Sequence, residues 1–251
     1  MNMNENTLKK LRQMKLLGMA NVLETSLANT QRETLNCDEF LSVLVDAEHD
    51  DRTNRRIERN IRNARFRYKA SIEELFHDVE RNMNRTLLSR LAACNYIDKA
   101  ENILITGSTG IGKSYVASAF GNQACIQGYK VFYSNTKRLF TKLKLSKADG
   151  SYLKELSRIE QTDLLILDDF GLQELDAFGR NALMEIIEDR HSKKSIIIVS
   201  QLPVSLWHEI IGEETVADAI MDRIVHNAYR FELHGESLRK RKRVSENTAI
   251  G

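Results

Sequence analysis

The stretch ILITGSTGIGKSYV, residues 103–116, constrains the fold of this chain more than any other feature. An apolar run leads into a turn with three glycines, which is followed by Lys113, Ser114 and the start of a helical pattern. A strand, a glycine-rich turn and a helix in this order form the phosphate-binding loop G-x-x-x-x-G-K-[ST]. The sequence therefore predicts a nucleotide-binding α/β domain, and a chance glycine-rich turn is the weaker alternative.

The residues of this loop have separate expected roles. Glycines let the backbone turn its N–H groups toward phosphate oxygens, and the positive end of the following helix adds to the attraction. Lys113 is expected to reach the β and γ phosphates, and the Ser114 hydroxyl to bind Mg²⁺. The residues expected to hold the nucleotide are Gly107, Ser108, Thr109, Gly110, Ile111, Gly112, Lys113, Ser114 and Tyr115.

A second motif, LLILDDFG, ends an apolar run in the carboxylates Asp168 and Asp169. Ligands of open parallel sheets bind beyond the carboxyl ends of the strands, so this pair is expected to face the phosphate loop. Because neighbouring residues of a strand point in opposite directions, the two carboxylates need not share a role. Asp168 is predicted to bind Mg²⁺, and Asp169 to orient and deprotonate the attacking water. The alternative is a solvated strand end.

Two further sites are less specific. The run SIIIVSQLPVSLW ends in Ser200 and Gln201, and either could sense the γ-phosphate, although polar residues commonly end strands. Arg223 lies within an apolar helical pattern, and the planar guanidinium suits phosphate. In many NTPases an arginine from a neighbouring subunit stabilises the transferring charge. The alternative for Arg223 is a surface ion pair, for example with Asp222.

The pattern of the chain changes between residues 70 and 100. Before this point, residues 8–27 and 40–68 carry apolar residues at helical spacing. After it, short apolar runs alternate with amphipathic stretches, which predicts a parallel sheet covered by helices on both faces. We expect a small all-helical domain over 1–70 and an α/β domain over 71–251, with a linker at about 71–100. The predicted strands are Asn102–Thr106, Val131–Ser134, Leu164–Asp168, Ile196–Ser200 and Tyr229–Leu233.

Basic residues are concentrated before the α/β domain. From Arg52 to Lys69 there are eight of them against the single acid Glu58. On a helical projection, Ile57, Ile61, Ala64 and Tyr68 share one face, and the opposite face carries arginines. Such a surface can neutralise DNA phosphates without reading bases, so it predicts duplex binding with little sequence specificity and a steep salt dependence. The alternative is a solvated helix face. We call Arg52, Arg55, Arg56, Arg59 and Arg62 the basic stripe.

Composition excludes other classes of protein. No apolar run approaches the roughly 18 residues of a membrane span. The first residues lack the order of a secretory signal, and Cys37, Cys94 and Cys125 form no CxxC pair. We therefore expect a cytosolic protein with no membrane and no zinc.

Four motifs together resemble one family. They are GSTGIGKS, LLILDDFG, IIIVSQLPV with Trp207 and His208, and ADAIMDRIVHNAYRFELHGESLRK. They are similar to those of the IstB-type transposition helper ATPases of bacterial insertion sequences, which belong to the AAA+ initiator clade together with DnaC-type helicase loaders. The resemblance covers nearly the whole chain. It implies an AAA+ P-loop fold, cytoplasmic location in a bacterium, and an ATPase that assembles as a homo-oligomer on duplex DNA and helps a partner transposase to select its target.

The resemblance also implies residue roles. Arg223, in the DR pair, resembles the arginine finger that acts in trans, and Arg239, in the S-x-R pattern, resembles the second sensor. The first sensor falls on Ser200 or Gln201; DnaC-type loaders tend to have Asn at the second place, so Gln201 favours the transposition branch. Two alternatives stay open. A DnaC-like replicative helicase loader would use the N-terminal helices to bind the helicase, and a small-molecule kinase would need no arginine from a neighbour.

Overall fold

The structure, a computed structural model, describes residues 3–28, 35–76 and 84–235. The chain forms two compact units, residues 1–59 and 60–251. The boundary falls inside α3 (Cys37–Ala64), a helix of 28 residues. The division at residue 70, and the functions expected on either side of it, stay predictions. No helix in the described ranges is long and apolar enough to cross a membrane.

The first unit is helical, as the sequence predicts. It contains α1 (Met3–Gln13), α2 (Leu17–Ala28) and the first part of α3. The buried residues of α2 are Gly18 and Ala20, and the backbone N–H of Gly18 donates to the carboxylate of Glu48 at 2.9 Å. A Cβ at Gly18 would lie 2.3 Å from the carbonyl oxygen of Ala47. Glycine is therefore required where α2 and α3 approach each other.

The second unit is built on a five-stranded parallel sheet with the order β2-β3-β4-β1-β5. All five predicted strands are confirmed, with bounds that agree to within two residues. The elements are α4 (Ile72–Phe76), α5 (Arg85–Ala92), α6 (Asn95–Asp98), β1 (Asn102–Gly107), α7 (Lys113–Ile126), β2 (Val131–Asn135), α8 (Thr136–Ala148), α9 (Tyr152–Glu160), β3 (Leu164–Phe170), α10 (Ala177–Arg190), β4 (Ser195–Ser200), the 3-10 turn Val204–Leu206, α11 (Trp207–Ile211), α12 (Glu214–Val225) and β5 (Ala228–Leu233).

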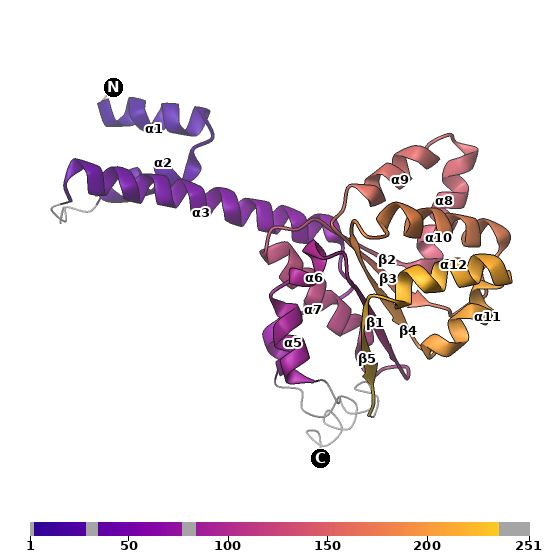
Figure 1. Cartoon of the computed structure of the whole chain (residues 1–251). Helices are drawn as coiled ribbons and strands as arrows, with labels where there is room; N and C mark the ends of the chain where they lie inside the picture. Colours follow the sequence, from indigo (N-terminus) through magenta and orange to yellow (C-terminus); the bar gives the residue numbers. More distant parts are fainter. Residues whose placement is uncertain (1–2, 29–34, 77–83, 236–251) are drawn as a thin grey trace, which may run out of the picture. The chain divides into compact units, whose positions relative to one another are not determined.

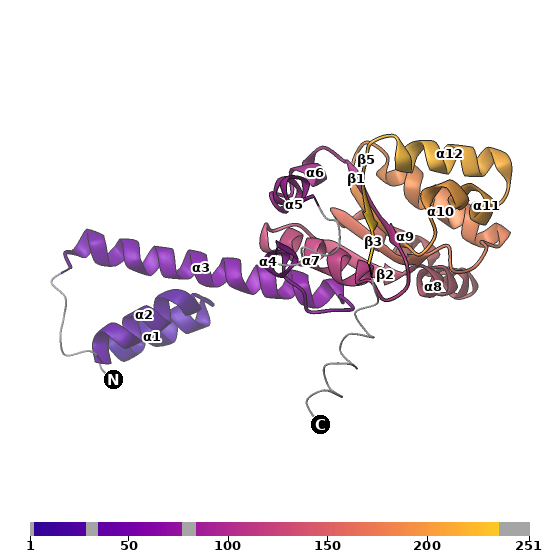
Figure 2. The same ribbon diagram turned by 90° about the horizontal axis from the view of Figure 1, so that it is seen from below.

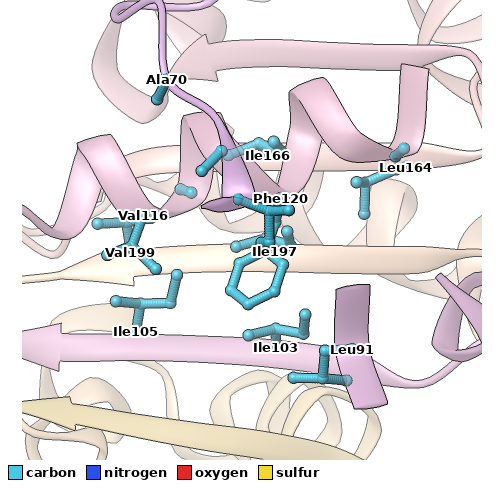
Figure 3. Close-up of a cluster of buried hydrophobic side chains, with 14 of the residues drawn as sticks. Ala70, Leu91, Ile103, Ile105, Val116, Phe120, Leu164, Ile166, Ile197 and Val199 are labelled. Carbon is cyan, nitrogen blue, oxygen red and sulfur yellow. The ribbon is translucent and has the colours of Figure 1, made fainter. Parts of the chain in front are cut away.

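Alternation along the strands gives the sheet two apolar faces, as period-2 side-chain geometry requires. Ile103 and Ile105 of β1 pack with α7, including Phe120, in one core cluster, which Figure 3 shows. Leu104 points to the other face, where it joins apolar residues of α8, α9, α10, α11 and α12. Figures 1 and 2 show these helices on one side of the sheet. Both faces are therefore covered, and α7, which follows the phosphate loop, is fixed by the core beneath it.

The helix that carries the basic stripe ends earlier than the sequence pattern suggests. It stops at Ala64, because Arg65 adopts the left-handed conformation with φ 59°, which ends a helix. Ile57 and Ile61 are half-buried and Ala64 is buried, which confirms that part of the predicted apolar face. Tyr68 was wrongly placed on that face: it lies in the segment after the helix. The last turn is anchored by Asn60, whose side chain donates to the carbonyl oxygens of Gly128 and Tyr129.

Candidate nucleotide-binding site

The phosphate loop has the backbone that a phosphate cradle needs. Gly107, Gly110 and Gly112 have φ values of 142°, 84° and 99°, which favour glycine. A Cβ at Gly107 would lie 2.4 Å from the carbonyl oxygen of Leu233 on β5. Within the described ranges, the backbone N–H groups of residues 108–112 donate to no backbone carbonyl. These donors, at the N-terminus of α7, fit phosphate oxygens.

Lys113 is held inside this loop. The residue is only 7% exposed, and its Nζ donates to the carbonyl oxygen of Ser108 at 2.8 Å. Burial lowers the pKa of the Lys113 ammonium, and the charges of Asp168 and Asp169 act in the opposite direction. The ammonium group is therefore already largely removed from water at the place where the motif requires it to meet phosphate.

Ser114 and Asp168 meet at the carboxyl edge of the sheet. The Ser114 Oγ donates to Asp168 Oδ1 at 3.0 Å, and the hydroxyl of Tyr133 donates to Asp168 Oδ2. Asp168 is only 1% exposed, and its backbone carbonyl accepts from Thr136 at 2.9 Å. A hydroxyl and a carboxylate are the hard oxygen ligands that Mg²⁺ prefers, so these two side chains fit the ion that the motif implies.

Asp169 follows in an unusual conformation. Its φ is 59°, a left-handed value that aspartate adopts more readily than most residues, and the pairing of β3 with β4 shifts register between Leu167 and Phe170. The carboxylate accepts from the Asn135 side chain at 2.9 Å. Because of the shifted register, strict alternation does not apply here, and both carboxylates lie within reach of one guanidinium, that of Arg67.

Three residues of this site were not predicted from the sequence. Tyr133 and Asn135 come from the carboxyl end of β2, where Asn135 is in register with Asp168. Polar residues at the end of a parallel strand are the signal that could have found them, and it is the same signal that found Asp168. Arg67 had no such signal, because it appeared as one of eight basic residues outside the predicted sheet.

The two candidates for the first sensor have different surroundings. Ser200 is fully buried, and its hydroxyl donates to the carbonyl oxygen of Phe170 at 2.8 Å and accepts from the backbone N–H of Leu202. Gln201 instead accepts at its Oε1 from the hydroxyl of Thr109, in the phosphate loop, at 2.5 Å. The structure thus places Gln201 in contact with the phosphate loop, whereas the Ser200 hydroxyl is hydrogen-bonded to β3.

Arg223 lies at the opposite edge of the sheet. Its backbone carbonyl accepts from the side chain of Asn102, the first residue of β1, and the loop begins at the last residue of that strand. The six residues of β1 span five steps of about 3.3 Å, so roughly 17 Å separate the two edges. The guanidinium forms an ion pair with Glu188 of α10 at 2.9 Å. The sequence suggested Asp222 as the partner, and the structure shows Glu188 in its place. Arg239 lies outside the described residues.

The five arginines of the basic stripe are all exposed, but they are not equivalent. Arg52 pairs with Glu48 at 2.7 Å, and Arg55 pairs with Asp51. Among the described residues, Arg56, Arg59 and Arg62 form no ion pair. The sequence treated all five alike, because the acids that neutralise the first two stand before the basic segment.

The parallel sheet with its covered faces, the phosphate loop and the adjoining carboxylates together define an AAA+ P-loop nucleotide-binding protein. Solved structures with this fold include DnaI (TM-score 0.55, 23% identity, covering 67% of this chain and 90% of that one). Another is AMPPCP-bound DnaA from Aquifex aeolicus (TM-score 0.56, 20% identity, 74% of this chain and 56% of that one). These similarities show the fold.

The chain matches the family model of IstB-like ATP binding proteins over residues 9–246, and it belongs to that family. It is 43% identical over 237 residues to an insertion sequence ATP-binding protein of Sinorhizobium fredii, covering 94% of this chain and 97% of the relative. It is 30% identical over 240 residues to an ATP-binding protein in an insertion sequence of Mycobacterium tuberculosis, covering 95% and 96%. The family resemblance found in the sequence is confirmed.

Proposed function

We propose that this protein is an ATPase that assembles on duplex DNA in an ATP-dependent manner and assists a partner transposase in target selection and insertion. The relatives are ATP-binding proteins of insertion sequences, which supports a role beside a transposase. The observation that carries the enzymatic part is the convergence of the phosphate loop, the Ser114–Asp168 contact and Asp169 at one edge of the sheet.

The residues at this edge have different roles in hydrolysis. The loop N–H groups and Lys113 bind the phosphates and neutralise their charge. Mg²⁺, which Ser114 and Asp168 would hold, supplies further neutralisation of the phosphate oxygens. Asp169 orients the attacking water and accepts its proton, while Asn135 fixes the carboxylate. Gln201, hydrogen-bonded to Thr109 of the loop, acts as the first sensor.

Arg223 completes this site in a neighbouring subunit. It lies at the amino edge of its own sheet, roughly 17 Å from its own loop by the length of β1, so it is unsuited to the site of its own chain. An arginine at one edge and a loop at the other fit a head-to-tail assembly, in which the finger of one subunit meets the nucleotide of the next. ATP at that junction then bridges subunits, which makes assembly depend on ATP.

The DNA part of the proposal rests on the basic stripe. Arg56, Arg59 and Arg62 are exposed and carry no acidic partner within the described residues, so their charge is available for phosphates. They come from one continuous helix, α3, which presents them at helical spacing. Contacts of this kind bind the DNA backbone and select no base sequence.

Sedimentation of the purified protein with a random-sequence duplex, in ATP and in ADP at one salt concentration, tests the assembly. We expect a large complex that forms on the duplex with ATP and is absent with ADP. A small species that ignores the duplex in both nucleotides would contradict the proposal and would favour the helicase-loader alternative.

Substitution within the basic stripe tests the DNA interaction. The triple variant Arg56→Ala, Arg59→Ala, Arg62→Ala should bind duplex more weakly, and its slope of log affinity against log salt should fall by about 0.9 for each DNA phosphate that the variant no longer neutralises. The matched control is Arg52→Ala with Arg55→Ala, because these two charges are already paired with acids. An unchanged slope in the triple variant, or an equal effect per charge in the control, would contradict this use of the stripe.

A further inference from the structure

Arg67 belongs to the segment that joins α3 to α4, and its neighbours fix this segment against the sheet. Phe66 packs edge-on against Tyr133, with ring centroids 6.1 Å apart, and a Cβ at Gly121 of α7 would lie 2.4 Å from the Phe66 ring. Tyr68 lies against Tyr115, also at 6.1 Å between centroids. Ala70 is buried in the cluster of Figure 3. The backbone on both sides of Arg67 is therefore held in place.

The Arg67 guanidinium bridges the two carboxylates of the candidate site. Its Nη1 lies 3.4 Å from Asp168 Oδ2 and 3.2 Å from Asp169 Oδ2. Asp168 is thereby shared between two sides: Oδ1 accepts from Ser114, whereas Oδ2 accepts from Tyr133 and Arg67. Arg67 therefore contacts the oxygen of Asp168 that does not face Ser114, and it leaves free the side on which Ser114 and Asp168 would hold Mg²⁺.

The Arg67 guanidinium also helps to fix the direction of the second carboxylate. Asp169 has two fixed donors, the Arg67 guanidinium and the Asn135 amide, and these determine where its carboxylate points. The Arg67 side chain is 42% exposed, so screening by water makes its effect on orientation more important than its effect on stability.

We propose that Arg67 is a positioning residue for ATP hydrolysis and acts within its own subunit. It orients the Asp169 carboxylate for proton transfer from the attacking water, and it keeps Asp168 Oδ1 turned toward Ser114. This role rests on the proposed ATPase function. It differs from that of Arg223, which serves the neighbouring subunit: the site then depends on one arginine in cis and one in trans.

Steady-state ATP turnover on a saturating random-sequence duplex tests this role in the full-length protein. Removal of a side chain that orients a metal-binding or catalytic residue costs about 10- to 100-fold, so Arg67→Ala should lose that factor in kcat while its KM for ATP changes by less than about twofold. Arg67→Lys keeps the charge but not the planar fork, and it should recover part of this decrease. The matched control is Arg138→Ala, because Arg138 lines the same cavity of about 630 Å³ and, in the described residues, no hydrogen bond or ion pair joins its side chain to either carboxylate.

Equilibrium binding of a fluorescent ATP analogue, titrated with Mg²⁺, gives a readout that does not need turnover. We expect Arg67→Ala and Arg67→Lys to bind the analogue as wild type does, with the same Mg²⁺ midpoint. Faster turnover or a lower Mg²⁺ midpoint in Arg67→Ala would overturn the proposal, because the guanidinium would then compete with the ion. Normal kcat in both variants would overturn it as well. Absence of turnover in wild type would instead count against the proposed ATPase.

Discussion

A buried cation lies at each of the two edges of the parallel sheet, but the two differ in how many of their donors are hydrogen-bonded within the protein. At the carboxyl edge, the Lys113 ammonium donates to one carbonyl oxygen, that of Ser108. Its other N–H donors have no hydrogen-bond partner among the described residues. At the amino edge, Arg190 is 1% exposed and donates to the carbonyl oxygens of Ile159, Thr162, Asp163 and Ser195. Burial lowers the pKa of Arg190 to about 10, against the opposing charge of Asp163. A buried cation therefore indicates a ligand site only where its donors are left available.

Arg223 is the exception at the amino edge. Its side chain is 24% exposed, and its partner Glu188 lies at the surface with 56% exposure. Its Nε is buried without a hydrogen-bond partner in the described structure. Its Nη1 donates to the carbonyl oxygen of Ala219, and the Nε of Arg190 lacks a partner as well, so the two arginines differ chiefly in their exposure. We expect from this comparison that the carboxyl edge binds nucleotide and that Arg223, at the amino edge, is exposed enough to contact a second subunit.

The largest effect is expected at the carboxyl edge, from Lys113→Ala. The substitution removes the cation that the loop holds for the phosphates, so nucleotide binding or turnover should be abolished. Binding of the fluorescent ATP analogue and phosphate release measure the two separately. Because the removed group lies in the loop and not in the core, the unfolding transition should stay cooperative, and a normal turnover rate would break the assignment of this edge.

At the amino edge, Arg223→Ala should spare nucleotide binding and lower turnover by about 10³-fold or more, the usual effect of removing an arginine finger. Mixing provides the sharper measurement. Lys113→Ala subunits keep Arg223 and Arg223→Ala subunits keep the loop, so a mixture should recover activity that neither variant has alone. Failure of the mixture to recover any activity would contradict a role in trans. Glu188→Gln, which removes only the ion-pair partner, serves as the control.

A smaller effect separates the two sensor candidates at the carboxyl edge. Gln201→Ala removes the hydrogen bond with Thr109. The rate of turnover should fall by about 10-fold, the usual effect of losing a side chain that supports a site, and the free energy of unfolding should not change. Ser200→Ala removes hydrogen bonds to Phe170 and Leu202 and should cost about 1 to 3 kcal/mol of unfolding free energy, with turnover per folded molecule retained. Denaturant unfolding and phosphate release distinguish them, and the reverse pattern would assign the sensor to Ser200.

The sequence determined the features of this protein that are encoded locally. The alternating apolar runs predicted all five strands of the sheet, since side-chain period and burial are properties of a short segment. The phosphate loop could be recognised because its glycines, Lys113 and Ser114 are contiguous. The apolar face of α3 was correct up to Ala64, where the left-handed conformation of Arg65 ends the helix.

Only the tertiary structure decided which distant residues meet. Arg67 and Asp168 are 101 residues apart in sequence, and Thr109 and Gln201 are 92 apart. The order of the strands places β4 next to β1 and so brings Gln201 to the loop, and the left-handed conformation of Asp169 at the register shift puts its carboxylate within reach of the guanidinium that also contacts Asp168. The same applies to Arg223, whose place at the amino edge follows from the path of the chain around the sheet. Periodicity reports which face of an element is buried, whereas the partner of a polar side chain depends on how separate elements pack, and this depends on the whole chain.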